Sequence, residues 1–530
     1  MRDSKTHIEI AGYEIALSIP EGPFCGSLSA EQEEPGLALV KLVLQADEPA
    51  SPPVAMLEWA HPIIDTHAFW HPQAGRDRSL GFGWRGGFGS KATSSAPVGS
   101  LYSLAGRNRL TFALSDALNP VTIRAGVREE TAEIACSVAI FEETSSFGFG
   151  RPRPGGARAA TVAPLTRYEA TLRLDTRDIP YYQALGEVSH WWASLPGYEP
   201  APVPEIARLP MYSTWYSFHQ ALTPEGIEEQ CRLARELGCA AVIVDDGWQT
   251  TSNERGYAYA GDWRPVPEKL PDMRAHVDRV HALGLKYLLW YAVPFVGVHS
   301  EAYGRFRDKL LGEVGILGAG VLDPRFPEVR EYLIGTYEAA VREWDLDGLK
   351  LDFVDAFSPV PAFGGPRDRP VAAPPDEGGD GCDIPSVPDA VDRLLTDVIA
   401  RLRRIKPDVM VEFRQSYIGP LMRKYGNMFR AGDCPNEAVD NRVRTLDIRL
   451  LADGTATHAD MLMWHPDEPT ESAALQLLNV LFSVPQISVL LDRVTPEHVE
   501  MLRFWLGFWR EHRDVLLDGV LAPLHPEGLY

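Results

Sequence analysis

The sequence contains few cysteines, and none of them has the spacing of a metal site. Its six cysteines are scattered through 530 residues without a Cys-x-x-Cys pair. Cys231 and Cys239 are separated by eight positions across a predicted helix, which is typical of core residues rather than of zinc ligands. We therefore expect reduced thiols, as in a cytoplasmic protein.

Long hydrophobic runs are also missing. A membrane-spanning helix needs about 18 or more consecutive apolar residues. The most apolar stretch, residues 475–491, is interrupted by Asn479, Pro485 and Gln486. The first residues, MRDSKTHIEIAG, lack the apolar segment of a secretory signal. The sequence thus predicts a cytoplasmic location and no membrane partner.

Positive charge is in deficit. Lys and Arg number 51 against 73 Asp and Glu, so the net charge is −22. This surplus repels phosphate backbones and anionic lipids, which argues against nucleic acid and membrane surfaces as partners and favours neutral substrates. Hydrophobic residues make up 45% and charged residues 23% of the chain, which excludes a largely disordered protein.

The first third of the chain has the pattern of an antiparallel β-protein. Short β-rich runs such as LALVKLVLQ, RLTFAL, VTIRAGV, AEIACSVAIF and RYEATLRL are separated by turn residues. Such strands, without helical periodicity between them, predict an N-terminal β-sandwich over residues 1–176. A helical piece at 179–195 and the Pro-rich PGYEPAPVPE form a predicted linker over residues 177–207.

From residue 208 to 515 strands and helices alternate. We expect eight strands, at residues 209–217, 240–248, 285–293, 347–355, 408–415, 427–433, about 460–464, and 486–491. Helices are expected at 223–238, 272–284, 389–405 and 496–514, and in a region ending at Trp344. Eight such units predict a catalytic (β/α)8 TIM barrel, with a doubly wound open sheet as the alternative. The short tail, residues 516–530, leads us to expect a C-terminal β-domain that is absent or truncated.

One segment does not fit the alternation. Residues 358–388 are rich in Pro, Gly and Asp and have no hydrophobic period. They follow the fourth predicted strand, so on a barrel they lie at the C-terminal face, where loops gate active sites. A disordered surface excursion is the alternative.

Ionisable and aromatic side chains gather where the predicted strands end. The candidates are Asp245 and Asp246 on the second strand, Trp290 on the third, Lys350 and Asp352 on the fourth, Glu412 and Arg414 on the fifth, and Arg430 and Asp433 on the sixth, with Trp215 on the first. Carboxylates and Lys bind sugar hydroxyls, aromatic rings stack on the pyranose, and two carboxylates can break a glycosidic bond. Any one Asp could instead cap a helix, and Trp290 alone could be core. The set together favours carbohydrate chemistry.

A metal-dependent barrel is the main rival chemistry. His219 lies near the first strand, and His458 and His465 flank the seventh with Asp460 between them. No His-x-His stands on the first strand, and no phosphate-binding Gly-rich loop or Gly-x-Ser-x-Gly turn is present. We therefore predict no metal and no cofactor; a metal enzyme would lose activity with a chelator.

The stretches STWYSFHQ, VIVDDGWQ, the WY of the third strand, LKLDF and the AGD of the sixth occur in this order. In these stretches the chain resembles glycoside hydrolase family 36, the α-galactosidase and raffinose-synthase group. The resemblance implies a sandwich followed by a barrel and a retaining α-glycosidase, most simply an α-galactosidase, acting on small soluble glycosides by double displacement. It leaves a homo-oligomer open.

The resemblance also assigns roles. Asp352 of KLDF would be the nucleophile and Asp433 of AGD the general acid/base, with carboxyl groups about 5–5.5 Å apart. Lys350 would keep Asp352 ionised, while the pKa of Asp433 should be raised so that it carries a proton. Asp245 and Asp246 would bind the 4- and 6-hydroxyls of the sugar. Lys350 and Trp290 would line the −1 subsite, and Trp215 would border it.

Two positions depart from the family. Many members have a Cys-Ser-Gly-Gly type turn after the fifth strand, where this chain has Glu412-Phe413-Arg414-Gln415-Ser416, and many have Trp where Arg430 stands. Arg414 and Arg430 could accommodate an unusual or charged group. The simpler interpretation is that Glu412 and Arg414 pair with each other.

Other functions stay open at this point. The sugar could instead be an α-N-acetylgalactosaminide or a β-L-arabinopyranoside, or the enzyme could be a transglycosidase. A non-catalytic carbohydrate-binding relative is a second alternative, against which the presence of both Asp352 and Asp433 argues. Trp59, Trp70 and Trp84 of the β-domain could reach the barrel mouth or form sandwich core.

Overall fold

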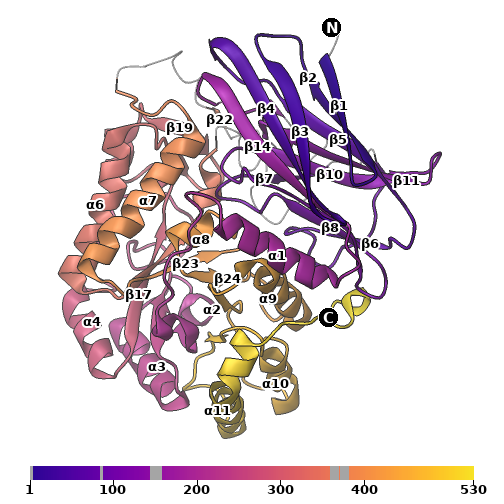
Figure 1. The fold of residues 1–530 in the computed structure, drawn as a ribbon. Helices are drawn as coiled ribbons and strands as arrows, with labels where there is room; N and C mark the ends of the chain where they lie inside the picture. The colour runs from indigo at the N-terminus through magenta and orange to yellow at the C-terminus, as the bar shows by residue number, and fades with distance from the viewer. Residues whose placement is uncertain (1–3, 84–86, 144–157, 161, 359–368, 371–380) are drawn as a thin grey trace.

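The computed structural model describes residues 4–83, 87–143, 158–160, 162–358, 369–370 and 381–530. An antiparallel β-structure precedes a helix-wrapped parallel sheet (Figure 1). Trp84 and most of the 358–388 segment fall outside the described residues.

The N-terminal half consists of two six-stranded antiparallel sheets. The first has the order β1 (Ser4–Ile10), β2 (Tyr13–Ile19), β5 (Ala55–Pro62), β11 (Glu133–Ile140), β10 (Val121–Arg128) and β7 (Phe88–Ser90). The second has the order β3 (Cys25–Glu34), β4 (Leu37–Ala50), β14 (Leu165–Asp175), β9 (Asn108–Leu114), β8 (Val98–Tyr102) and β6 (Ala68–Trp70). A two-stranded ribbon joins β12 (Glu142–Glu143) and β13 (Arg158–Ala159).

These two sheets share one hydrophobic core. Leu17 and Leu57 from the first sheet and Leu42 and Leu172 from the second are among its buried members. The strands alternate inward and outward residues, as β5 does with its strictly alternating burial. Period-two burial of this kind gives each sheet one apolar face, and the two apolar faces cover each other.

The second half contains the predicted barrel. Its sheet has the order β15 (Met211–Ser213), β16 (Ala241–Val244), β17 (Lys286–Ala292), β21 (Gly348–Asp352), β23 (Met410–Arg414), β24 (Met428–Arg430) and β25 (Ala456–His458), with β26 (Gln486–Ile487) beside β15. All these pairs are parallel. The last gap is bridged by backbone bonds from Val484 N to the Thr457 oxygen and from Leu462 N to the Gln486 oxygen, both 2.8 Å. These bridges make the sheet a nearly closed barrel and exclude the open, doubly wound alternative.

Helices surround the barrel and follow its strands. They are α2 (Trp215–Phe218), α3 (Pro224–Leu237), α4 (Met273–Ala282), α5 (Glu301–Phe306), α6 (Pro327–Trp344), α7 (Val387–Ile405), α8 (Met422–Tyr425), α9 (Ala438–Ala452), α10 (Thr470–Leu478) and α11 (Pro496–Asp518). The short 3-10 turns are η1 (Glu205–Arg208), η2 (Val354–Ala356) and η3 (Pro526–Gly528). A small sheet that was not predicted joins β18 (Phe295–Gly297), β20 (Ala319–Leu322) and β19 (Leu310–Val314), which follow β17, with β22 (Arg369–Pro370), which follows β21.

The caps of α3 follow from its sequence. The Thr223 side chain accepts a bond from Gly226 N, Pro224 occupies the first turn, and Gly238 ends the helix with φ +92°. A side-chain oxygen at the N-cap satisfies a free backbone N–H, and Gly adopts positive φ without strain. The same segment places Cys231 and Cys239 in the barrel core, as their spacing predicted.

Several predicted barrel strands were wrong in extent: the second ends at Val244, the sixth at Arg430 and the eighth at Ile487. The first ends at Ser213, and Trp215 begins a helical turn in which Phe218 N donates to the Thr214 oxygen at 2.9 Å. The seventh lies at 456–458 instead of 460–464. The Asn441 side chain bonds both the backbone N–H and the backbone oxygen of Asp460, each at 2.9 Å. These two groups therefore do not pair with a neighbouring strand.

Helix α1 (Tyr181–Ala193) joins the two halves, between β14 and the barrel (Figure 1). Its Trp192 indole donates to the Leu114 oxygen of β9 at 2.9 Å, and its Ser189 hydroxyl to the Leu451 oxygen of α9 at 2.6 Å. The helix is therefore bonded to both halves and fixes one against the other.

Candidate active site

Side chains inside the barrel form layers. The register of the strands sets Leu288, Gly348 and Met410 side by side in a lower layer. Trp290, Lys350 and Glu412 lie side by side in the layer above it. A third layer contains Asp352, Arg414 and Arg430, at the carboxyl ends of the strands. The lower layer is apolar and the upper two are charged, so polar groups gather at the end where barrel enzymes place their chemistry.

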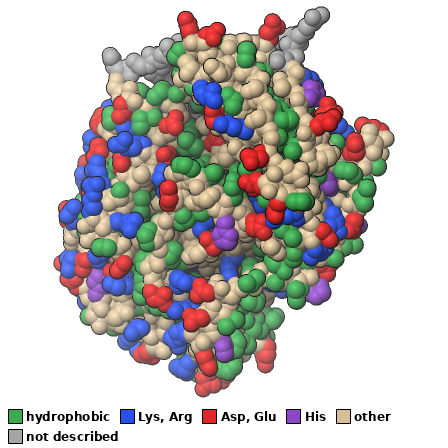
Figure 2. Space-filling model, in the orientation of Figure 1, with side chains coloured by type: hydrophobic (Ala, Val, Ile, Leu, Met, Phe, Trp, Pro, Cys, Tyr) green, Lys and Arg blue, Asp and Glu red, His purple; other side chains and the backbone are tan. Residues whose placement is uncertain are grey.

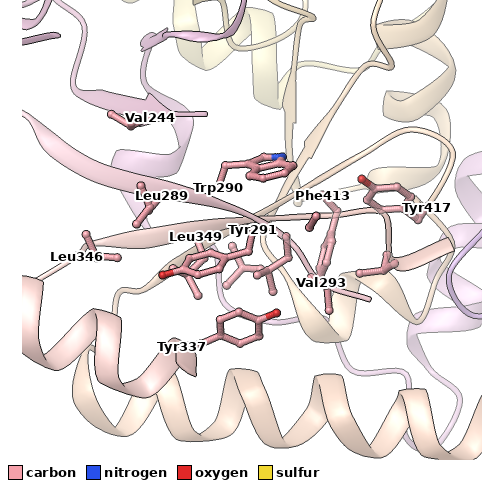
Figure 3. Packing of buried hydrophobic residues seen from close by; sticks show 14 of the residues in the cluster. Val244, Leu289, Trp290, Tyr291, Val293, Tyr337, Leu346, Leu349, Phe413 and Tyr417 are labelled. Atoms are coloured by element: carbon pink, nitrogen blue, oxygen red, sulfur yellow. The ribbon is translucent and has the colours of Figure 1, made fainter. Parts of the chain in front are cut away.

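Alternation along β17 separates this interior from the outer core. Trp290 lies on one side of the strand, while Tyr291 points to the other, toward Tyr337 of α6 (Figure 3). The Tyr291 and Tyr337 rings are 5.1 Å apart between centroids. Successive side chains of a strand face opposite sides. The residues between those that pack on the helices therefore point into the barrel and can line the site.

Asp352, at the end of β21, accepts four hydrogen bonds. Its Oδ1 receives Arg414 Nε at 2.8 Å, the backbone N–H of Phe353 at 2.7 Å and the Tyr417 hydroxyl. Its Oδ2 receives the Trp290 indole N–H at 3.0 Å. The carboxylate is 8% exposed and held in one orientation.

The surroundings keep this carboxylate ionised. Burial alone would raise the pKa of Asp352, but the positive charges of Arg414 and Lys350 and the bonds from Tyr417 and Trp290 outweigh burial and hold the pKa well below its usual value. The prediction that Lys350 keeps Asp352 ionised has the correct direction, although Arg414 has the larger effect. An ionised, desolvated carboxylate is a competent nucleophile.

Asp433 follows β24 and is the more accessible of the two acids, with 38% of its side chain exposed. Arg430 Nη2 donates to its Oδ1 at 2.9 Å. Burial raises the pKa of Asp433, but Arg430, Arg414 and Lys350 outweigh burial and lower it below its usual value. The predicted raised pKa is therefore wrong, because the sequence did not reveal that Arg430 bonds to this carboxylate. Asp352 acts on Asp433 as a like charge, which places the two acids within electrostatic reach.

Arg430 is buried among three carboxylates. Besides Asp433 it bonds Asp460 through Nη1, and its Nε lies 3.5 Å from Glu412 Oε1. Its side chain is 1% exposed. Arg430 is thus buried at the carboxyl end of β24, and Glu412 lies one layer below it on β23.

The predicted pairing of Glu412 with Arg414 is wrong. Arg414 bonds Asp352, and Glu412 accepts the Gln486 amide at 2.6 Å beside Arg430. Residues 412 and 414 stand two apart on β23, so their side chains occupy successive layers and meet neighbouring strands instead of each other. Burial raises the pKa of Glu412.

The acidic pair after β16 lies beside this centre. Lys350 Nζ donates to Asp245 Oδ2 at 2.5 Å. The amides of Gln220 and Gln249 each donate to Asp246 at 2.7 Å, yet burial raises the pKa of Asp246 to about 7. Gly247 has φ +120°, and a Cβ there would meet the Gln220 Cα at 2.5 Å, so only glycine fits this turn.

Aromatic rings border the site. Tyr257 is stacked on Trp290 with centroids 5.9 Å apart and packs edge-on against Phe353 at 5.1 Å. Trp215 is half-buried in α2, edge-on to His219 at 4.6 Å. Burial and then Arg255 lower the pKa of His219, while Asp245 and Asp433 act in the opposite direction. Trp215 and His219 thus form one aromatic pair on the segment after β15.

Tyr417 was not among the predicted site residues, and Asp460 was named only in the metal alternative. Tyr417 bonds the candidate nucleophile. The sequence offered one indication of this contact, namely that Tyr417 follows Arg414 by three residues at the end of the fifth predicted strand. Asp460, considered there for metal, accepts bonds from Arg430, from Cys434 N at 2.7 Å and from the Tyr216 hydroxyl at 2.9 Å. His458 Nδ1 accepts the Gln486 amide at 3.1 Å, and its Nε2 donates to the Ala207 oxygen at 2.7 Å. In the described part of the chain no three His, Cys, Asp or Glu side chains form a metal-binding group.

The β-domain tryptophans have structural contacts. Trp59 is sandwich core, packed edge-on against Phe112 at 5.2 Å. Trp70 donates to Asp447 of α9 at 2.8 Å. Neither described tryptophan reaches the barrel mouth.

Charges of both signs are interleaved over the face shown in Figure 2, without a large region of one sign. No helix within the described ranges is both long and apolar enough to span a membrane.

The barrel region is similar to known α-galactosidases. Residues 208–364 match the family model Melibiase. Alpha-galactosidase 2 of Pediococcus pentosaceus is 28% identical over 158 residues, which are 28% of this chain and 22% of that protein. Alpha-galactosidase Mel36A of Lactobacillus acidophilus is 29% identical over 127 residues, 23% of this chain and 16% of that protein. The matching region thus spans less than a quarter of these relatives.

Solved structures share the fold over nearly the whole chain. The α-galactosidase AgaA of Geobacillus stearothermophilus, a variant in complex with raffinose, has a TM-score of 0.66 at 16% identity, covering 98% of this chain and 73% of that chain. TtGalA, an α-galactosidase from Thermus thermophilus in complex with p-nitrophenyl α-D-galactopyranoside, has a TM-score of 0.55 at 16% identity, covering 95% of this chain and 94% of that chain.

Proposed function

We propose that this chain, a relative of the glycoside hydrolase family 36 α-galactosidases, is a retaining α-galactosidase that acts on small soluble α-galactosides. The single observation that carries the proposal is the state of Asp352. It is a buried carboxylate at the end of the fourth barrel strand, kept ionised by Arg414 and Lys350 and oriented by four donors. The relatives it matches are α-galactosidases by name, and two of the similar structures contain raffinose or an aryl α-galactoside.

In the proposed mechanism Asp352 attacks the anomeric carbon through Oδ2. Three donors occupy Oδ1, whereas Oδ2 receives only the Trp290 indole, so Oδ2 has lone pairs available. The C1–leaving-group bond breaks as the bond from Oδ2 to C1 forms, and Asp433 gives its proton to the departing oxygen. Asp433 then takes a proton from water, which attacks C1 and releases Asp352.

Asp433 must be protonated for the first step, although Arg430 favours its ionised form. A bound sugar would exclude water from the exposed side of this carboxyl group, and desolvation raises the pKa of an acid. In the proposed cycle, substrate binding therefore raises the pKa of Asp433 against the opposing effect of the Arg430 charge, and Asp433 takes up its proton.

Asp245, Asp246, Lys350, Trp290 and Trp215 are the proposed sugar-binding residues. The first two supply acceptors beside Lys350, and the rings supply apolar surface. Arg414 fills the end of β23 against Asp352, next to where C1 and its C2 substituent would lie. We favour galactosides over α-N-acetylgalactosaminides because the matched relatives are α-galactosidases by name. Transfer to a second sugar in place of water is the other outcome that the same covalent chemistry allows. The protein is proposed to act in the cytoplasm.

The test is a panel of aryl α- and β-glycosides given to the wild type and to Asp352→Asn, with chelator present. The proposal predicts cleavage of the α-galactoside, abolished in the variant and unaffected by chelator. Cleavage of another sugar alone would retain the mechanism and refute the galactose assignment. Loss of activity with chelator, or the absence of any turnover, would refute the proposal.

A further inference from the structure

We propose that the N-terminal β-domain positions the catalytic nucleophile, by means of a buried turn that holds the Tyr417 segment against Asp352. The inference rests on the proposed function and assigns the β-domain a part in catalysis without substrate contact. Tyr417 and residues 91–95 are positioning residues in this account.

The turn joins β7 to β8 and faces the barrel. Lys91, Thr93, Ser94 and Ser95 are all at most 9% exposed. Lys91 and Ser94 exchange two backbone bonds of 3.0 Å, which close the turn. Burying polar groups is costly unless they are bonded, and the turn bonds the barrel through its Ser95 backbone N–H and its Lys91 ammonium group.

The turn meets the segment that follows β23. Ser95 N donates to the Ser416 oxygen at 2.5 Å. A Cβ added to Gly419 would lie 2.6 Å from the Ser95 oxygen, a contact that real side chains do not make. The two backbones therefore approach too closely for any side chain at position 419, and movement of the turn would move the segment.

This segment reaches both proposed catalytic acids. The Tyr417 hydroxyl bonds Asp352 Oδ1, and Phe353 N donates to the same hydroxyl at 3.2 Å. The Gln415 side-chain oxygen accepts Gly432 N at 3.2 Å, one residue before Asp433. One short segment thus holds the nucleophile directly and the acid/base through its neighbour.

A second contact from the same turn reaches the loop after β21. Lys91 Nζ donates to the Phe357 oxygen at 3.2 Å and to Glu143 at 3.4 Å. The Glu143 side chain belongs to the β-domain and is 7% exposed. The strand that carries Asp352 is therefore held from the β-domain at the loop that leaves it, as well as through Tyr417.

Removal of the Tyr417 hydroxyl tests the first link. In Tyr417→Phe, Oδ1 keeps two of its three donors, so the carboxylate stays ionised but loses part of its orientation. Misplacement of a reacting group by about 1 Å costs on the order of 100-fold in rate. We expect kcat to fall about tenfold to 100-fold, KM to change by less than about threefold, and the acid limb of kcat/KM to move to higher pH, because the hydroxyl lowers the pKa of Asp352.

The matched control is Tyr425→Phe. The Tyr425 hydroxyl also bonds a carboxylate, Asp392 Oδ1 at 2.7 Å. Tyr425 lies in α8 and Asp392 in α7, outside the site. The control loses the same kind of bond, so it should lower the melting temperature comparably and leave kcat and the pH profile unchanged.

Gly419→Ala tests the link across the domains. The added methyl group pushes the turn and the segment apart, so we expect kcat to fall. In a protein that already carries Tyr417→Phe, the same Gly419→Ala change should lower kcat much less. Lys91→Gln with Glu143→Gln is a second variant, which removes the buried pair without leaving either charge alone. It should lower kcat with KM retained.

The outcomes separate the two proposals. A wild type without glycoside turnover refutes the proposed function. An active wild type with an unaffected Tyr417→Phe refutes positioning by Tyr417. Equal losses from Gly419→Ala in both backgrounds, or unchanged kcat in the Lys91/Glu143 variant, refute a role for the β-domain turn.

Discussion

Arg430 offers the sharpest perturbation of the proposed acid/base. Its Nη2 lies 2.9 Å from Asp433 Oδ1, and its charge is the largest of those that lower the pKa of Asp433. Replacement by Gln removes that charge. The companion change Asp460→Asn avoids an unpaired carboxylate beneath the site, because Asp460 also bonds Arg430.

The magnitude follows from the contact. A hydrogen bond to a charged group contributes about 1.5–3 kcal/mol, and one pKa unit corresponds to about 1.4 kcal/mol. Asp433 is 38% exposed, so solvent screens the interaction and we take the lower end, a rise of about one unit. The acid must be protonated to react, and a higher pKa keeps it protonated to higher pH.

The assay is the pH dependence of kcat/KM with an aryl α-galactoside, whose alkaline limb reports the acid of the free enzyme. We expect this limb to move up by about one unit in Arg430→Gln/Asp460→Asn. Arg423→Gln is the control, since Arg423 is 4% exposed and pairs with Asp453 away from the site. A folded double variant with an unmoved limb, or one moved to lower pH, would refute the assignment of Asp433 as the acid.

Three further predictions concern single contacts. Arg414→Met removes the strongest charge that lowers the pKa of Asp352, so the acid limb of kcat/KM should move up by about one to two units; an unchanged limb would argue against the ion pair. Asp246→Asn cannot accept both Gln220 and Gln249 amides and should raise KM for galactosides about tenfold or more in steady-state assays, whereas an unchanged KM would exclude a sugar contact. Asp447→Asn leaves Arg78 buried and without its carboxylate between the domains and should destabilise the fold by about 3–5 kcal/mol in calorimetry. Asp467→Asn, at a carboxylate that is 91% exposed, should have little effect.

Local signals predicted α1, α3, α4, α6, α7 and α11 and the positions of most barrel strands, whereas α9 and α10 were not predicted. Thr223, Pro224 and Gly238 bound α3 as expected, because capping is a local property of the chain. The seventh strand was misplaced because the Asn441 side chain, distant in sequence, takes the backbone bonds of Asp460. Such tertiary competition leaves no periodic signal.

The candidate site shows the same division. That Asp352 and Asp433 stand at strand ends follows from the alternation of strands and helices. Which charge meets which carboxylate does not, because partners depend on the register between neighbouring strands. Arg414 therefore pairs with Asp352 instead of Glu412, and Arg430 lowers the pKa of Asp433, against the sequence prediction.

The central claim is that Asp352 forms a covalent bond to the sugar, and its most direct test is product stereochemistry in Asp352→Gly with added azide. Without its carboxylate the variant should not hydrolyse an activated aryl α-galactoside. Azide, entering from the vacated side, should restore turnover and give the β-galactosyl azide, identified by NMR. Hydrolysis by Asp352→Gly at the wild-type rate, or an azide product of α configuration, would contradict the account.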